Sequence, residues 1–219
     1  MYEAEPMRFK ALTPGIINND VVDNVIQKPH LLEGGRPAKL FLAGGGQYYK
    51  GTDLLIQSLK FVTYPCELHF FTDPKYFYEV AKNDVANLPK QHTVIIHDYL
   101  PHEELIRILS KEADILMNTT RSFGIAPQSA GFPSKMMEYA AMGRPIVSSE
   151  IGKLDDEFDS KITYYEKEDV KSLAQCITEV IENYEAKERL ALELQQIALT
   201  KYTIKGTAET FKEFFKTLV

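Results

Sequence analysis

Short apolar runs alternate with longer segments of helical period from residue 39 onward. Six runs of four or five residues are typical of buried strands: Lys39–Ala43, Glu67–Phe71, Thr93–His97, Ile115–Asn118, Pro145–Ser148 and Ile162–Tyr165. Between them, Asp53–Phe61 and Glu103–Lys111 carry apolar residues at the spacing of one helix face. Alternating strands and helices build a parallel sheet with helices on both faces. We therefore predict an α/β fold with a single Rossmann-like, doubly wound parallel sheet.

The two ends of the chain show different patterns. The C-terminal part has no further strand pattern and predicts helices over roughly Asp169–Asn183, Ala186–Thr200 and Thr207–Leu218. Residues 1–38 hold few periodic apolar positions and several breakers, so we predict a linker or leading strand there. Residues 39–219 are then one domain.

Composition and charge narrow the class of protein. The 219 residues are 44% hydrophobic and 26% charged, as in ordinary globular domains. The net charge is −6, and no run of Lys and Arg interleaves with aromatic residues, which disfavours nucleic acid as a partner. No apolar stretch is long enough to span a bilayer, and the N-terminus is acidic where a signal peptide would be basic. Cys66 and Cys176 are isolated, which suits a reducing compartment, so we expect a cytoplasmic protein.

The first candidate site is a glycine-rich loop after the first predicted strand. Gly44, Gly45 and Gly46 would let the backbone approach a ligand closely. Lys50 and the amides of the following helix favour an anion such as a diphosphate. A flexible turn with a solvated lysine fits the same residues, because the loop matches neither the P-loop nor the dinucleotide fingerprint.

The second candidate is the helix expected to begin at Ser134 and to end at Gly143, directly before a strand. Lys135 and Glu138 are three residues apart and share one helix face. That face could present a cation to a phosphate and a carboxylate to the two hydroxyls of a ribose. Alternatively, Glu138 only pairs with Lys135 near the helix N-terminus.

A third candidate is the segment His97–Pro101, which follows a predicted strand. Tyr99 and Leu100 could line a pocket for a base, although an ordered loop is the commoner role of such residues. His97 and His102 are too few for a metal site, and no Asp-x-Asp pair occurs in the chain. We expect neither a metal nor a cofactor.

Four segments in order carry a resemblance to a known family: Lys50–Ile56, Tyr99–Leu105, Ala113–Ile115 and Gly131–Val147. Together they resemble the C-terminal, nucleotide-sugar-binding domain of retaining GT-B glycosyltransferases of the glycogen synthase and sucrose synthase type. The likeness extends over about residues 12–219. The last segment is similar to the branch that makes bacterial capsule and cell-surface polysaccharides.

The resemblance implies roles for individual residues. Glu138 matches the second glutamate of the family's paired-glutamate motif, which holds the ribose, and Lys50 matches the lysine that holds the donor diphosphate. Ala130 stands in place of the first glutamate, and Gly45 in place of an arginine. Lys50 and Lys135 are then the remaining phosphate cations, and we expect both to act catalytically on the departing diphosphate. The expected nucleotide contacts are Gly44, Gly45, Gly46, Tyr99, Leu100, Phe132, Pro133, Ser134 and Glu138.

The activity implied is transfer of a sugar from a UDP-sugar to a glycan or lipid-linked acceptor, with retention and without a metal. GT-B enzymes hold donor and acceptor between two Rossmann-like domains, and one such unit is predicted here. We therefore expect the isolated chain to be inactive without an N-terminal acceptor domain or a partner subunit. Peripheral association with a membrane could occur through that missing half.

Two other functions fit part of the sequence. A non-catalytic nucleotide-binding module, or a subunit of a split enzyme, is favoured by the loss of a carboxylate at Ala130. A protein similar to sugar-nucleotide 2-epimerases would share the fold. That family needs several acidic and histidine residues around the sugar, and the sequence does not supply them.

Overall fold

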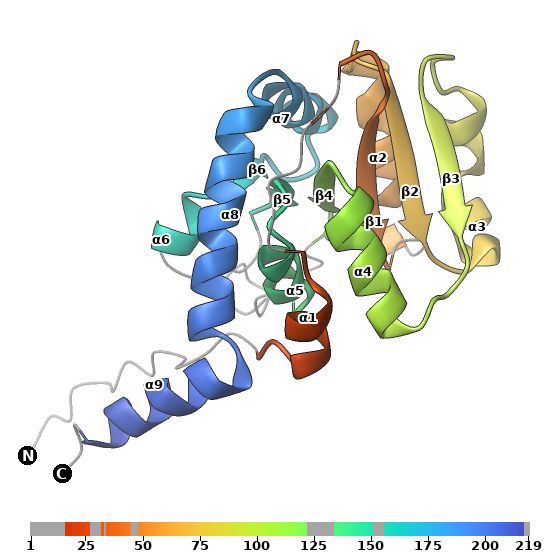
Figure 1. Ribbon diagram of the computed structural model, residues 1–219. Coiled ribbons are helices and arrows are strands. Elements are labelled where there is room, and N and C mark those ends of the chain that lie inside the picture. Colours follow the sequence, from red (N-terminus) through yellow and green to blue (C-terminus); the bar gives the residue numbers. More distant parts are fainter. Residues whose placement is uncertain are drawn as a thin grey trace, which may run out of the picture.

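The computed structural model describes residues 16–26, 32, 34–44, 48–121, 134–150 and 156–216. Six strands form one sheet in the order β3-β2-β1-β4-β5-β6, and every neighbouring pair is parallel (Figure 1). The strands are β1 (Ala38–Ala43), β2 (Cys66–Phe71), β3 (Thr93–His97), β4 (Ile115–Asn118), β5 (Ile146–Ser149) and β6 (Thr163–Tyr165). The predicted α/β, doubly wound sheet is confirmed. Its order reverses between β1 and β4, and ligands bind at the carboxyl ends of strands at such a switch point.

Helices cover both faces of the sheet. One face is covered by α2 (Thr52–Ser58), the short 3-10 helix η2 (Leu59–Phe61), α3 (Pro74–Ala86) and α7 (Val170–Glu182). The other is covered by α1 (Asn19–Asn24), α4 (His102–Glu112), α5 (Ser134–Met142), α6 (Asp156–Asp159) and α8 (Tyr184–Lys201). The 3-10 helix η1 (Tyr48–Lys50) precedes α2, and α9 (Ile204–Lys216) extends away from the sheet (Figure 1).

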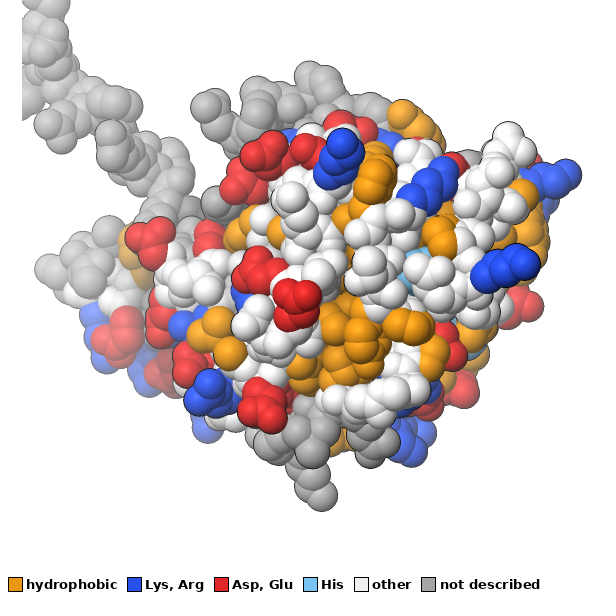
Figure 2. All heavy atoms as spheres, turned by 90° about the horizontal axis from the view of Figure 1, so that it is seen from above, with side chains coloured by type: hydrophobic (Ala, Val, Ile, Leu, Met, Phe, Trp, Pro, Cys, Tyr) orange, Lys and Arg blue, Asp and Glu red, His pale blue; other side chains and the backbone are white. Residues whose placement is uncertain are grey.

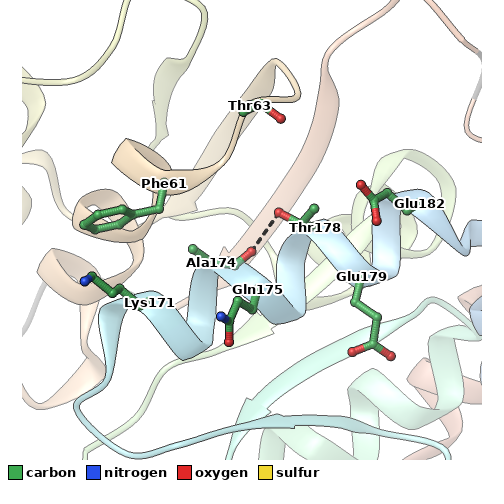
Figure 3. A pocket seen from close by; sticks show the side chains of 8 residues that line it. All are labelled: Phe61, Thr63, Lys171, Ala174, Gln175, Thr178, Glu179 and Glu182. Carbon is green, nitrogen blue, oxygen red and sulfur yellow. Dashed lines mark hydrogen bonds between the residues drawn. The ribbon is translucent and has the colours of Figure 1, made fainter.

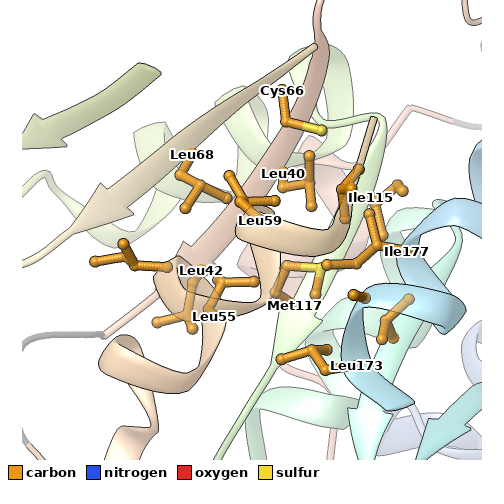
Figure 4. Packing of buried hydrophobic residues seen from close by; sticks show 14 of the residues in the cluster. Leu40, Leu42, Leu55, Leu59, Cys66, Leu68, Ile115, Met117, Leu173 and Ile177 are labelled. Carbon is orange, nitrogen blue, oxygen red and sulfur yellow. The ribbon is translucent and has the colours of Figure 1, made fainter. Parts of the chain in front are cut away.

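Side chains of β1 alternate between the two cores, as the period of a strand requires. Leu40 and Leu42 pack toward α2 and α7, where Leu55 and Leu173 meet them (Figure 4). Phe41 points to the opposite face, toward α4 and α5. All these side chains are buried, and each contributes about 1.5 to 3 kcal/mol through loss of apolar contact with water. The central strand is thereby fixed between two helix layers.

Each predicted strand agrees with the observed one to within a residue at either end, but α1, α3, α6 and the short η1 were not predicted. In α3 the apolar stripe is weak, since Phe77 and Ala81 are its buried apolar residues, although Asp73 caps the helix by accepting from Lys75 N at 2.8 Å. The segment before residue 38, predicted as a linker or leading strand, contains α1 and the fully buried Val21. The prediction for that segment was therefore wrong over residues 19–24. No helix in the described part of the chain is long and apolar enough to cross a membrane.

Candidate functional site

The carboxyl end of β1 is joined to α5 by a buried tyrosine. Ala43, the last residue of β1, donates its N–H to the Tyr139 hydroxyl at 2.9 Å. Tyr139 is fully buried in the middle of α5, so this bond fixes the first turns of α5 against the switch point. Gly44 follows with φ +73°, a conformation that favours glycine, and turns the chain away from the strand. Lys135, one turn before Tyr139, and Glu138, the residue directly before it, are thereby placed at the ligand end of the sheet.

Lys135 is a buried cation. Its Nζ atom is shielded from water and has no hydrogen-bond partner within the described part of the chain, although part of its side chain reaches solvent. The Nζ atom lies 5.9 Å from the centroid of the Tyr139 ring. Burial, with a smaller contribution from the charge of Lys50, lowers the pKa of Lys135 to about 7. A buried ammonium is normally paired, so an anion bound beside Lys135 would stabilise its charge.

Lys50 ends η1, and its backbone is held by the loop after β4. Thr119 donates its hydroxyl to Lys50 O at 2.7 Å. The next residue, Gly51, has φ +67°, and a Cβ atom there would lie 2.1 Å from Thr119 O. Only glycine allows the two loops to approach so closely. Burial lowers the pKa of Lys50, and its Nζ lies 5.1 Å from the ring centroid of Tyr49.

Arg121 follows β4 and joins the loop after β1 to the turn before α7. Its guanidinium forms a bidentate ion pair with Asp53 at 2.7 and 2.9 Å, and its Nε lies 3.0 Å from Glu168 Oε2. Its Nη1 also donates to Tyr48 O at 2.7 Å. Burial alone would lower the pKa of Arg121, but the two carboxylates outweigh that effect and raise it. Arg121 therefore fixes η1, and with it Lys50, relative to β4.

Glu138 pairs with a histidine of α4, which the sequence did not suggest. Its Oε1 lies 3.2 Å from His102 Nε2, and His102 Nδ1 lies 2.7 Å from Asp20 Oδ2. The alternative in which Glu138 pairs with Lys135 is not supported, because Lys135 Nζ has no hydrogen-bond partner in the described residues. Burial raises the pKa of Glu138, and the neighbouring His102 opposes that shift. The Glu138 side chain remains about one-third exposed, so it is not sealed from ligand.

Other predicted site residues lie partly or wholly outside the described residues. Gly45, Gly46, Phe132 and Pro133 are in that group, and Ser134 begins α5 without a described side chain.

The predicted base pocket is not assembled by any described contact. Tyr99 is 69% exposed, and Leu100 is half-buried against the core on the α4 and α5 side. His97, which begins the same segment, is hydrogen-bonded to His69 of β2 at 2.9 Å. The nucleotide-binding role of Tyr99 and Leu100 thus stays a prediction.

Sequence reasoning missed Arg121, Tyr139 and His102. Arg121 stands three residues after a predicted strand at the carboxyl edge of the sheet, and a cation there is a usable signal. In the sequence, Tyr139 fits the apolar face of the predicted helix, so its hydrogen bond to β1 was not expected. The role of His102 depends on contacts with α1 and α5, which are distant in sequence.

A groove of about 490 Å³ lies elsewhere, between η2 and α7 (Figure 3). Phe61 and Thr63 form one wall, and α7 residues such as Lys171, Thr178 and Glu182 form the other. In the view from above, hydrophobic side chains gather in several patches, the broadest in the lower centre, with acidic side chains on its left and basic ones toward the top and right (Figure 2). The groove contains none of the residues that meet at the switch point, so it is separate from the site.

Solved structures with the same fold include glycosyltransferases and a sucrose-phosphate synthase. A glycosyltransferase from Rickettsia africae aligns with TM-score 0.66 and 17% identity, over 84% of this chain and 48% of that protein. Sucrose-phosphate synthase from Thermosynechococcus elongatus aligns with TM-score 0.64 and 14% identity, over 94% and 50%. Anabaena HepE, in complex with UDP and glucose, aligns with TM-score 0.64 and 15% identity, over 83% and 48%. At these identities the likeness shows the fold, and this chain spans about half the length of those proteins.

Sequence comparison gives the family. No curated protein matches the chain at a significant level. The family described as "Glycosyl transferases group 1" matches residues 36–183, which is more than half of the chain and includes Lys50, Lys135 and Glu138. With this match, and with a fold that corresponds to one half of a GT-B enzyme, the chain belongs to the glycosyl transferases group 1 family.

Proposed function

We propose that this chain is the donor-binding domain of a glycosyltransferase that uses a UDP-sugar. One observation carries the proposal: Lys135 Nζ is buried without a hydrogen-bond partner in the described residues, near Lys50 and in the first turn of α5. Two cations and the amides of a helix N-terminus favour a bound anion. The position at the β1–β4 switch point is the one at which open α/β sheets bind nucleotides.

In this proposal Lys50 and Lys135 hold the donor diphosphate and stabilise the negative charge that develops as it departs. Charges fixed in place before the reaction need no reorganisation when the leaving group forms, so they lower the barrier to transfer. Arg121 contributes indirectly, by holding η1 against β4. Glu138 accepts hydrogen bonds from the ribose hydroxyls, for which its exposed edge is available.

Finer features of the activity are part of the same proposal. The sugar is transferred with retention and without a metal, to a glycan or lipid-linked acceptor, and the family branch is the one that makes bacterial capsule or cell-surface polysaccharide. Solved neighbours with UDP or UDP-glucose support the choice of nucleotide. The place of action is the cytoplasm, and no cofactor takes part.

Transfer needs a second, acceptor-binding region in addition to these residues. Holding donor and acceptor in near-attack geometry supplies about 7 to 11 kcal/mol of a barrier. We propose that an N-terminal domain or partner subunit provides this region, and with it any peripheral contact with a membrane. The chain alone is then expected to bind nucleotide and to transfer no sugar. Transfer by the chain alone would refute this part.

Calorimetry with UDP-glucose and GDP-glucose tests donor binding. Lys135→Met and Glu138→Ala should each weaken UDP-glucose affinity about 10-fold or more, since hydrogen bonds to charged groups contribute about 1.5 to 3 kcal/mol. Lys82→Met and Glu104→Gln change exposed residues on α3 and α4 and serve as matched controls. Failure of both nucleotide sugars to bind at millimolar concentration would refute the function.

Proton uptake gives a second readout. Because the pKa of Lys135 is about 7, a bound diphosphate should restore its proton, and UDP-glucose binding at pH 8 should take up close to one proton. The uptake is measured by titrating in buffers that differ in ionisation enthalpy. It should disappear in Lys135→Met and persist in Lys82→Met. Equal uptake in both variants would exclude Lys135 as the diphosphate cation.

A further inference from the structure

Three helices meet at His102. It is the first residue of α4, and both of its ring nitrogens face carboxylates from other helices. Nδ1 lies 2.7 Å from Asp20 Oδ2 of α1, and Nε2 lies 3.2 Å from Glu138 Oε1 of α5. No other histidine in the described part of the chain has a carboxylate within 4.0 Å of each ring nitrogen.

This geometry sets the protonation state of the ring. An ionised carboxylate only accepts hydrogen bonds, so each nitrogen of His102 must carry a proton to bind its partner. A neutral imidazole has one N–H and would leave one carboxylate unbound. The arrangement is therefore complete only with an imidazolium between two carboxylates.

We propose that His102, held as an imidazolium by Asp20, is the positioning residue that fixes the Glu138 carboxylate for the ribose of the donor. The inference rests on the proposed function, because it assigns the ribose to Glu138. His102 binds one oxygen of the Glu138 carboxylate and thereby restricts the rotamer of that side chain, which remains about one-third exposed to a ligand. Asp20 touches neither Glu138 nor the diphosphate cations through any described contact, and acts through His102.

The charges around His102 favour its protonated, imidazolium form. Asp20 faces it from α1 and Glu138 from α5, and both raise the pKa of His102, with the hydrogen bond that His102 donates to Asp20 as the largest cause. Burial acts in the opposite direction, as does the positive end of α4, where His102 stands. On α4 itself, Glu103 and Glu104 are neighbouring acids, and Arg107 bonds Asn24 of α1 at 3.4 Å.

A pH dependence of nucleotide affinity follows. As pH rises through the pKa of His102, the ring loses a proton and can no longer bind both carboxylates. Glu138 is then held less firmly, and a positive charge beside an anionic ligand is lost. Loss of the His102 proton should contribute about a two- to fivefold fall in UDP-glucose affinity, the range expected for a partly exposed ion pair, in addition to the alkaline fall caused by deprotonation of Lys135. The contribution of His102 is therefore measured in the Lys135→Met background, where the Lys135 contribution is absent.

A double-mutant cycle tests the assignment. UDP-glucose affinity is measured at pH 6 for the wild type, His102→Gln, Glu138→Gln and the double variant. We expect His102→Gln to weaken affinity about two- to fivefold when Glu138 is present and less than twofold when it is replaced. An equal effect in both backgrounds would overturn the proposal, because His102 would then act independently of Glu138.

Asp20→Asn supplies a readout that a merely structural role would not change. With its first partner neutralised, His102 should lose its proton at lower pH, and the alkaline loss of affinity should move to lower pH with it. Asp23→Asn makes the same substitution on the exposed side of α1 and should leave the profile unchanged. A profile that Asp20→Asn does not move would refute the role of His102.

An NMR titration separates failure of this inference from failure of the proposed function. The His102 midpoint is measured without ligand in the wild type, Asp20→Asn and Glu138→Gln, and should fall in both variants. If UDP-glucose does not bind but both midpoints fall, the coupling of His102 to Glu138 stands and the nucleotide function does not. Midpoints that stay unchanged overturn the inference, whatever the ligand does.

Discussion

Replacing Lys135 with methionine should stabilise the fold. A pKa of about 7 in place of the ordinary 10.5 means that folding at neutral pH requires loss of a proton or burial of a charge. At 1.36 kcal/mol for each pH unit, this penalty is about 4 kcal/mol at pH 7. Methionine has a similar length without the charge, so Lys135→Met should raise the free energy of unfolding by up to that amount.

The gain should depend on pH in a defined direction. The folded-state pKa of Lys135 lies below its unfolded value, so between pH 7 and 10.5 the unfolded chain binds more protons than the folded chain. Wild-type stability therefore rises with pH over this window, through the contribution of Lys135. The advantage of Lys135→Met should shrink from about 4 kcal/mol at pH 7 to about 1 kcal/mol at pH 9.5.

Urea unfolding followed by circular dichroism at pH 7.0 and 9.5 measures both quantities. Lys82→Met, on the exposed surface of α3, is the control and should change stability by less than about 0.5 kcal/mol. If Lys135→Met destabilises the protein, or if its advantage is the same at both pH values, Lys135 does not bear an unpaired buried charge. If the stability lost by burying Lys135 is linked to binding, Lys135→Met must also weaken UDP-glucose affinity.

Three further predictions concern the surroundings of the site. Gly51→Ala should destabilise by about 2 to 4 kcal/mol in urea unfolding, because φ +67° is strained for alanine and its Cβ would clash with the β4 loop; a cost under about 0.5 kcal/mol would contradict the close approach. Arg121→Met should cost about 3 to 5 kcal/mol in the same assay, since it leaves Asp53 uncompensated, and Asp53→Asn in addition should recover part of the loss. Burial lowers the pKa of both His69 and His97, so the unfolded chain binds more protons than the folded chain at acid pH. Their contribution to the free energy of unfolding should be fully present above their unfolded pKa of about 6.5 and be lost as pH falls below it. Urea unfolding at pH 7.5 and 5.0 measures this loss, which should be smaller in His69→Phe.

The sheet could be predicted because its strands are local patterns. β4 is four buried residues between two helices, and its apolar run is sufficient to identify it. The helix α3 was missed because its apolar residues form only a weak stripe; in the structure Phe77 packs on Phe70 at a ring distance of 4.9 Å. Such a contact joins two elements and has no signature in either one alone.

The site could be predicted in part for the same reason. Lys135 and Glu138 share a helix face by their spacing, and the structure places that face at the switch point. What could not be predicted was the partner of Glu138. His102 stands 36 positions earlier in the sequence, and the two meet only because α4 and α5 pack side by side on the same face of the sheet.

Lys135 and Glu138 on α5 do not pair with each other, and this bears on anion binding. Lys135 and Glu138 carry opposite charges three residues apart, and pairing them would have satisfied both at little cost. Instead Glu138 is bound by His102, and Lys135 Nζ is buried without a hydrogen-bond partner in the described residues. A buried cation without a partner among the described residues costs stability at the carboxyl edge of the sheet, and an anion that bound there would offset this cost and gain affinity. Because Glu138 is directed toward His102, the described residues form no internal ion pair that would compete with a diphosphate for Lys135.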